Sequence, residues 1–144
     1  MDRRTRAREL AMQGLYQLDV QGESLLEHLC SFMVESEPDD LARKLAWDWT
    51  RGAWRNLAEC DELIGRAMIK WEISRLSQVD KSILRLSVYQ LKFCKDIPPK
   101  VVINEAIEMA KKFSTAQSPG FVNGVLDGIL KMLEKGDKRI GEPV

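Results

Sequence analysis

The chain has 144 residues, which is enough for one domain with a substantial hydrophobic core. Its hydrophobic share of 44% and charged share of 31% exclude a disordered chain, and 22 basic side chains balance 22 acidic ones. No apolar run approaches the roughly 20 residues of a membrane span, and the N-terminus lacks the pattern of a signal peptide. Cys30, Cys60 and Cys94 form no CxxC pair, so we expect buried thiols in a reducing, cytoplasmic environment.

The first predicted helix spans Arg3–Val20, with apolar residues at the i, i+3, i+4, i+7 spacing of one face. Met12 and Tyr16 lie nearly opposite that face, where a surface helix should be polar. Either this helix is covered on two sides or these two residues await a partner. Gly22 is predicted to end it, and Ser24 to cap a second helix.

A long helix is predicted next, from Leu41 to Met68, after a loop at residues 37–40 that closes with an N-cap signal. Gly52 and Gly65 within it are either close-packing points or weak spots. Residues 71–77 form a connector in which a serine can cap the next helix, at Ser74 or at Ser77. The connector is expected to separate two helical subdomains, at about 3–71 and 74–135.

The stretch Gln78–Lys95 is apolar over most of its circumference when it is wound as a helix. Only Lys81, Arg85 and Lys92 share a polar strip, and such a helix is buried. We therefore predict an all-α fold of about six to seven helices packed around this central helix. Two further helices are predicted, at Lys100–Phe113 and from Ser118 to a stop at Gly136, followed by a short tail at 136–144.

Charge is unevenly distributed along the chain, although its formal sum is zero. Residues 1–8 carry four arginines and one aspartate, whereas residues 19–40 carry seven acidic side chains and no lysine or arginine. A basic arm suggests a polyanion partner, because guanidinium groups bind phosphates and stack on unpaired bases. The acidic block suggests a basic partner or simply a solvated face.

The sequence contains no pattern that supports an enzyme. His28 is the only histidine, so any Ser–His–Asp or Cys–His site would have to use it, and no cysteine or acid stands at a metal-ligand spacing from it. Phosphate-binding loops of the GxxxxGK[ST] and GxGxxG types are absent. We therefore expect neither catalysis nor a cofactor.

Four segments, in this order, closely resemble the NusB family of bacterial transcription antitermination proteins: RRTRARELAMQGLYQLD, QVDKSILRLSVYQL, IPPKVVINEAIEMAKKF and SPGFVNGVLDGIL. The resemblance runs from about Arg3 to Leu133. It implies an all-α domain of two helical subdomains that binds boxA, a single-stranded element of ribosomal RNA leaders. It also implies pairing with the ribosomal protein NusE, and indirect action with other Nus factors and RNA polymerase.

Carried over by position, the resemblance implies RNA-binding and partner-binding residues. The RNA-binding residues would be Arg3, Arg4, Arg6, Arg8, Gln117, Ser118 and Phe121, of which Phe121 either stacks on a base or packs in the core. The NusE-binding residues would be Tyr16 and Asp80.

The chain departs from the family pattern at several of these places. Thr5 stands where an arginine is common and Gly120 where a basic residue can occur, and both changes point to a lower RNA affinity. Ser74 and Arg75 replace acidic residues of some relatives, which puts part of the NusE contact in question.

Two alternatives to the antitermination factor stay open at this point. One is a protein–protein module, such as a homodimer that covers its RNA face. The other is the RNA-binding segment of a ribosomal RNA methyltransferase. No nucleotide-binding strand and Gly-rich loop follow the last helix, and this disfavours the methyltransferase reading.

Overall fold

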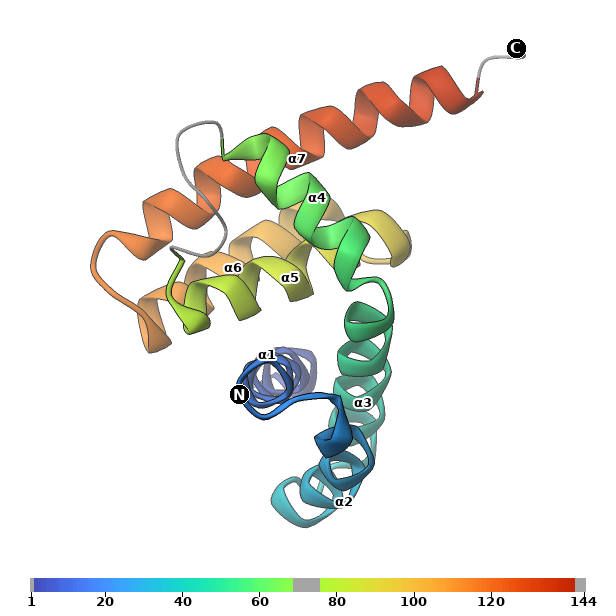
Figure 1. Ribbon diagram of the computed structural model, residues 1–144, viewed down its shortest axis with the longest axis vertical. Helices are drawn as coiled ribbons and strands as arrows, with labels where there is room; N and C mark the ends of the chain where they lie inside the picture. Colours follow the sequence, from blue (N-terminus) through green and yellow to red (C-terminus); the bar gives the residue numbers. More distant parts are fainter. Residues whose placement is uncertain (1, 69–75, 142–144) are drawn as a thin grey trace.

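A computed structural model describes residues 2–68 and 76–141, with side chains up to residue 136. Every element in the described part is helical, which confirms the all-α prediction. In chain order the elements are α1 (Arg3–Gln21), the 3-10 turn η1 (Glu23–Leu25), α2 (Leu26–Ser36), α3 (Asp40–Arg55), α4 (Leu57–Ala67), α5 (Gln78–Phe93), α6 (Pro99–Phe113) and α7 (Ser118–Gly141). Figure 1 shows α5 in the middle of the molecule, surrounded by the other long helices.

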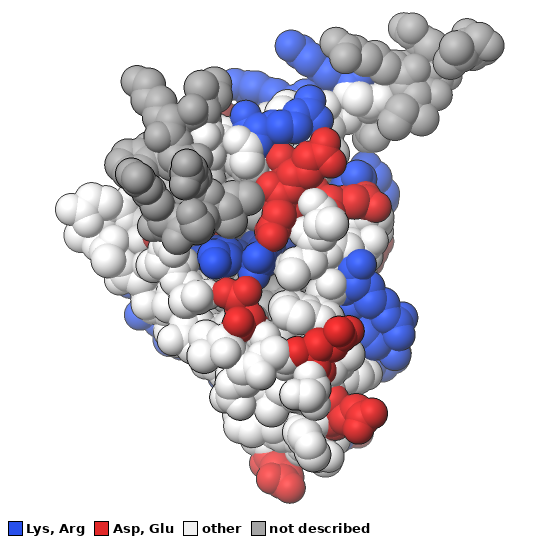
Figure 2. Space-filling view, in the orientation of Figure 1, with Lys and Arg blue, Asp and Glu red and all other residues white. Residues whose placement is uncertain are grey.

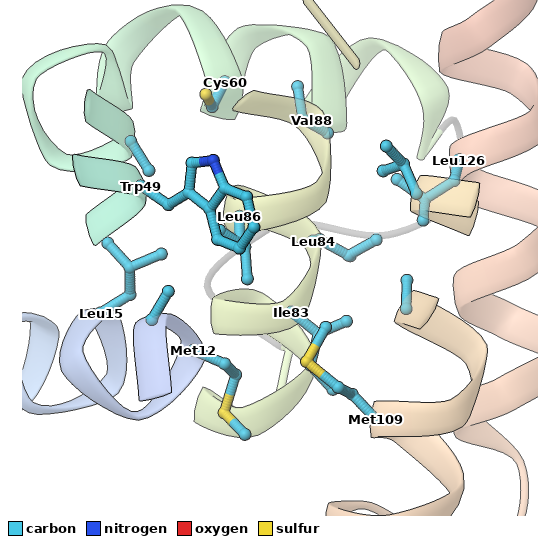
Figure 3. Packing of buried hydrophobic residues seen from close by; sticks show 14 of the residues in the cluster. Met12, Leu15, Trp49, Cys60, Ile83, Leu84, Leu86, Val88, Met109 and Leu126 are labelled. Atoms are coloured by element: carbon cyan, nitrogen blue, oxygen red, sulfur yellow. The ribbon is translucent and has the colours of Figure 1, made fainter. Parts of the chain in front are cut away.

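Helix α5 is the central element, as its apolar circumference predicts. It packs against α1, α3, α4, α6 and α7, and its interior positions Ile83, Leu84, Leu86 and Val88 are fully buried. Figure 3 shows these side chains meeting residues from the helices around them. A continuous apolar core of this kind supplies most of the stability of a helical domain, because burial removes apolar area from water.

Local capping signals determine where several helices begin. The Asp39 side chain accepts a hydrogen bond from the Ala42 N–H at the start of α3, and the Ser77 hydroxyl accepts one from Asp80 N–H at the start of α5. The prediction that Ser24 caps the second helix is wrong. Gly22 has a φ of 96° and is followed by η1, so that α2 begins without a side-chain cap.

The predicted helix from Leu41 to Met68 is two helices, which meet at Asn56. Asn56 has φ −108° and ψ 25°, outside the α-helical range. Its side chain donates a hydrogen bond to the Gly52 carbonyl oxygen at 2.8 Å, and the same oxygen accepts the helical bond from the Asn56 N–H at 3.1 Å. Gly52 itself is a close-packing point, because a Cβ there would overlap the Tyr89 ring and hydroxyl of α5. Gly65 is exposed.

The expectation that Arg85 lies on a polar surface strip is wrong. Arg85 is 6% exposed, and its guanidinium donates hydrogen bonds to Asp61 of α4 at 2.8 Å and to Asp19 of α1 at 2.9 Å. Burial by itself would lower the pKa of Arg85, but the bonds to both carboxylates outweigh it and raise the pKa. This ion-pair network connects α1, α4 and α5.

Two smaller expectations also change. Helix α7 continues through Gly136 to Gly141, so that glycine does not end it. Cys30 is exposed, whereas Cys60 is buried and Cys94 is half-buried, and all three thiols are free. The predicted connector lies mostly outside the described residues, so the boundary between the subdomains stays a prediction.

Within the described part, no helix is both long enough and apolar enough to cross a membrane.

Candidate nucleic-acid interface

The arginine arm forms the first two turns of α1. Asp2 caps the helix by accepting a hydrogen bond from Arg4 N–H, and the first turn contains no acidic residue. Arg3 and Arg4 are exposed, Arg6 is half-buried and Arg8 is buried. The N-terminus of a helix already carries partial positive charge. Three accessible guanidinium groups beside it make this end of α1 attractive to a polyanion.

Two of the arm's arginines pair with the loop between α2 and α3. The Arg3 Nε–H lies 2.9 and 3.0 Å from the two carboxylate oxygens of Asp39. The Arg6 Nε–H donates to Glu37 Oε2 at 2.8 Å. The hydrogen bonds from Arg3 and Arg6 lower the pKa values of Asp39 and Glu37, respectively. Both carboxylates are therefore ionised at neutral pH.

The Arg8 side chain is buried and contacts residues of the interior. Its guanidinium lies 5.2 Å from the centroid of the Trp49 ring, and it donates to Gln90 of α5 and Glu105 of α6 at 3.4 Å. Burial lowers the pKa of Arg8, opposed by the nearby Glu105 carboxylate. Its side chain is only 3% exposed.

Helix α6 is bound to α1 by polar bridges along its length. The Thr5 hydroxyl donates to Glu105 at 2.7 Å, and Lys112 donates to Glu9 at 3.0 Å. Between these bridges lies an open groove of about 690 Å³, lined by both helices, with Asn104 on the α6 side. The polar bridges hold the arm's helix in a fixed position relative to α6.

Asp80 and Ser118, predicted to face different partners, are bonded to each other. The Ser118 hydroxyl donates to one Asp80 oxygen at 3.0 Å, and the Ser114 hydroxyl donates to the other at 2.7 Å. Ser118 is 2% exposed. Together these bonds fasten the α6–α7 connection to the first turn of α5.

Tyr16 lies on the edge of a second groove. This groove has a volume of about 410 Å³ and is lined by one face of α1 together with Val79 of α5 and Phe113 of α6. Tyr16 is 37% exposed, whereas Met12 beside it is buried in the core. The two residues opposite the main apolar face therefore differ: Met12 is covered by the fold, and Tyr16 remains accessible.

Gln117 and Phe121 flank the buried Ser118. Gln117 is exposed, and Phe121 is partly buried against the core. Within the described residues, no hydrogen bond, ion pair or ring contact joins either residue to the arm. Because Phe121 is neither fully buried nor fully exposed, base stacking and core packing are compatible at this position.

The sequence reasoning missed the partners of the arm. Arg3 pairs with Asp39, Arg6 with Glu37 and Arg8 with Glu105. The uneven charge of residues 19–40 was the available signal, but nothing in the sequence showed that this block folds back on the arm.

No group of His, Cys, Asp or Glu in the described part of the chain could hold a metal ion. Figure 2 shows, on the face in view, basic and acidic side chains interspersed without a large field of one sign.

A model of the NusB family matches residues 5–131. The transcription antitermination protein NusB of Geobacter sulfurreducens is 46% identical over 138 residues, which cover 94% of this chain and 100% of that protein. T. maritima NusB has a TM-score of 0.81 at 42% identity, over 91% of this chain and 92% of the other. A chain from a crystal structure of the antitermination factors NusB and NusE in complex with dsRNA has a TM-score of 0.79 at 30% identity, over 92% and 98%.

Proposed function

The chain belongs to the NusB family, and from this premise we propose that it is an RNA-binding transcription antitermination factor. The observation that carries the proposal is the group of accessible arginines in the first two turns of α1. Relatives with high coverage are named as antitermination proteins, and a chain of similar fold was crystallised with RNA. Because the family is one of antitermination factors and not of enzymes, the expectation of a non-enzymatic protein is confirmed.

The RNA that we propose is single-stranded boxA of ribosomal RNA leaders, bound by Arg3, Arg4 and Arg6. Unpaired RNA suits these groups, since guanidinium planes bind phosphates and stack on splayed bases. Arg4 is exposed, and among the described residues no carboxylate pairs with it. We therefore infer that Arg4 makes the first phosphate contact. The exposed Gln117 and the accessible part of Phe121 would extend the site along the strand.

Arg8 and Ser118 have positioning roles in this proposal. Arg8 connects α1 to α5 and α6 through Gln90 and Glu105, which fixes the direction in which the arm points. Ser118 fixes the loop that carries Gln117 through its bond to Asp80. Both residues therefore act on RNA through the groups that they hold rather than through contacts of their own.

The protein partner that we propose is NusE, which would contact the groove beside Tyr16. The exposed tyrosine and the apolar groove wall are features that protein interfaces favour. Asp80 would have a positioning role beside this surface, because both of its carboxylate oxygens are already engaged by Ser114 and Ser118. Other Nus factors and RNA polymerase would be engaged through the resulting complex.

The test is a binding titration with labelled RNA, with and without NusE. Single-stranded boxA, a scrambled strand and boxA annealed to its complement are compared, using the native protein and a Tyr16→Ala variant. The proposal predicts that boxA binds most tightly and that NusE strengthens it. The Tyr16 variant should lose only the strengthening by NusE. Equal binding of all three RNAs, together with a mass that doubles with concentration, would favour the homodimer whose RNA face is covered.

A further inference from the structure

The loop between α2 and α3 presents two carboxylates to the arginines that RNA would use. We propose that Glu37 and Asp39, together called the acidic latch, compete within the molecule with RNA phosphates for Arg6 and Arg3. This inference rests on the proposed RNA-binding function and adds a regulatory element to that site. The acidic block is thereby assigned a basic partner inside the same chain.

The geometry of the latch imitates that of a bound phosphate. Arg3 uses its Nε–H toward both oxygens of Asp39, at 2.9 and 3.0 Å, and Arg6 uses its Nε–H toward Glu37 at 2.8 Å. A phosphate would be recognised by these same donors, because guanidinium binds carboxylate and phosphate oxygens in similar arrangements. RNA must therefore compete with the latch for these Nε–H donors.

The latch is held in place by bonds that do not involve the arm. Asp39 N–H donates to Glu37 Oε1 at 3.2 Å, and the second oxygen of Asp39 caps α3 by accepting from Ala42 N–H at 2.8 Å. Arg43 donates to the Glu37 carbonyl oxygen at 2.8 Å. Because the loop is ordered by its own contacts, the latch loses little conformational freedom when it meets the arm.

The latch divides the arm's arginines into two classes. Arg4 is open, whereas Arg3 and Arg6 exchange one set of charge-assisted bonds for another when RNA binds. A polyanion that offers only charge gains little from such an exchange. An RNA that also makes base-specific contacts elsewhere on the surface can displace the latch and then use all three arginines. The latch thus lowers affinity for arbitrary RNA more than for the correct strand.

The test compares two variants of equal charge in the full chain. Glu37→Gln/Asp39→Asn removes the latch and retains the acceptor atoms that the loop needs, including the α3 cap. Glu27→Gln/Glu35→Gln removes two exposed carboxylates of α2 that pair with no arginine of the arm among the described residues. Binding of scrambled single-stranded RNA should be about fivefold tighter for the latch variant than for the control, since two partly exposed ion pairs are lost.

Two further readouts make the outcome unambiguous. The gain should shrink as salt rises, because exposed pairs are screened, and Arg3 and Arg6 Nε–H NMR signals should exchange faster with solvent in the latch variant. Glu37→Gln alone, which leaves the Asp39 cap intact, repeats the test if the double variant unfolds. Arm-dependent RNA binding with equal affinity of latch and control variants would overturn the latch alone. RNA binding that does not depend on the arginines of the arm would overturn the proposed function, and the latch with it.

Discussion

Replacing Arg85 with methionine should lower the free energy of unfolding by about 3 kcal/mol. The Arg85 side chain is 7% exposed, and its two partners, Asp19 and Asp61, are 18% and 28% exposed. Removing one member of a buried ion pair costs about 3–5 kcal/mol because the remaining charges lose their partner. The lower end applies here, since Asp61 can regain water and Asp19 keeps Lys81 at 3.5 Å.

Urea unfolding followed by circular dichroism measures this loss. Lys92→Met is the matched control, because Lys92 and Glu59 approach equally closely, at 2.8 Å, but are 35% and 52% exposed. An exposed pair contributes under about 1 kcal/mol. If Arg85→Met and Lys92→Met lose the same stability, the network does not hold α1, α4 and α5 together.

The same network predicts how stability changes with pH. Burial by itself raises the pKa of Asp19, but hydrogen bonds and charge from Arg85 and Lys81 outweigh it and lower the pKa. The folded protein therefore binds this proton only at lower pH than the unfolded chain does. The stability that Asp19 contributes is fully present above its pKa in the unfolded chain, about 4. It is lost as the pH falls through the lowered pKa of Asp19 in the folded protein. Asp19→Asn should flatten this part of the stability curve, and an unchanged curve would contradict the assignment.

Two further predictions concern packing and thiol chemistry. Gly52→Ala should destabilise the protein by about 1–3 kcal/mol, because the new methyl group meets the Tyr89 ring. Gly120→Ala, with nothing within 4 Å of its Cβ, should be neutral or stabilising in thermal melts, and equal losses at both sites would refute the packing argument. A thiol reagent should label exposed Cys30 quickly and leave Cys60 intact until unfolding, since burial raises the pKa of that thiol to about 12. Rapid labelling of Cys60 in the native state would contradict its burial.

The sequence was sufficient for the fold class and for the central helix. Apolar periodicity identified α5. The N-cap signal of the loop at 37–40 and the candidate cap Ser77 marked helix starts that the structure confirms. It was insufficient at Asn56, where non-helical backbone angles (φ −108°, ψ 25°) divide a continuous apolar pattern into two helices. Periodicity reports which face is apolar and does not register a local change of direction.

The candidate site was less predictable, because its character depends on tertiary contacts. The arginines of the arm are evident in the sequence, but the burial of Arg8 depends on Trp49 and Gln90, which are distant along the chain. The pairing of Arg6 with Glu37 likewise requires the α2–α3 loop to return to α1. Charge can be counted from the sequence, whereas the partner of each charge follows only from the fold.

The most direct test of the RNA-binding account is the salt dependence of boxA binding by the native protein and by Arg4→Ala. Loss of one phosphate contact to a single strand should weaken binding and reduce the slope of log K against log salt by about 0.7. The control is Arg55→Ala, which removes an equally charged, exposed side chain at the end of α3. A smaller slope for Arg4→Ala with an unchanged slope for Arg55→Ala is the predicted result. Equal slopes for all three proteins would contradict the assignment of RNA to the arm.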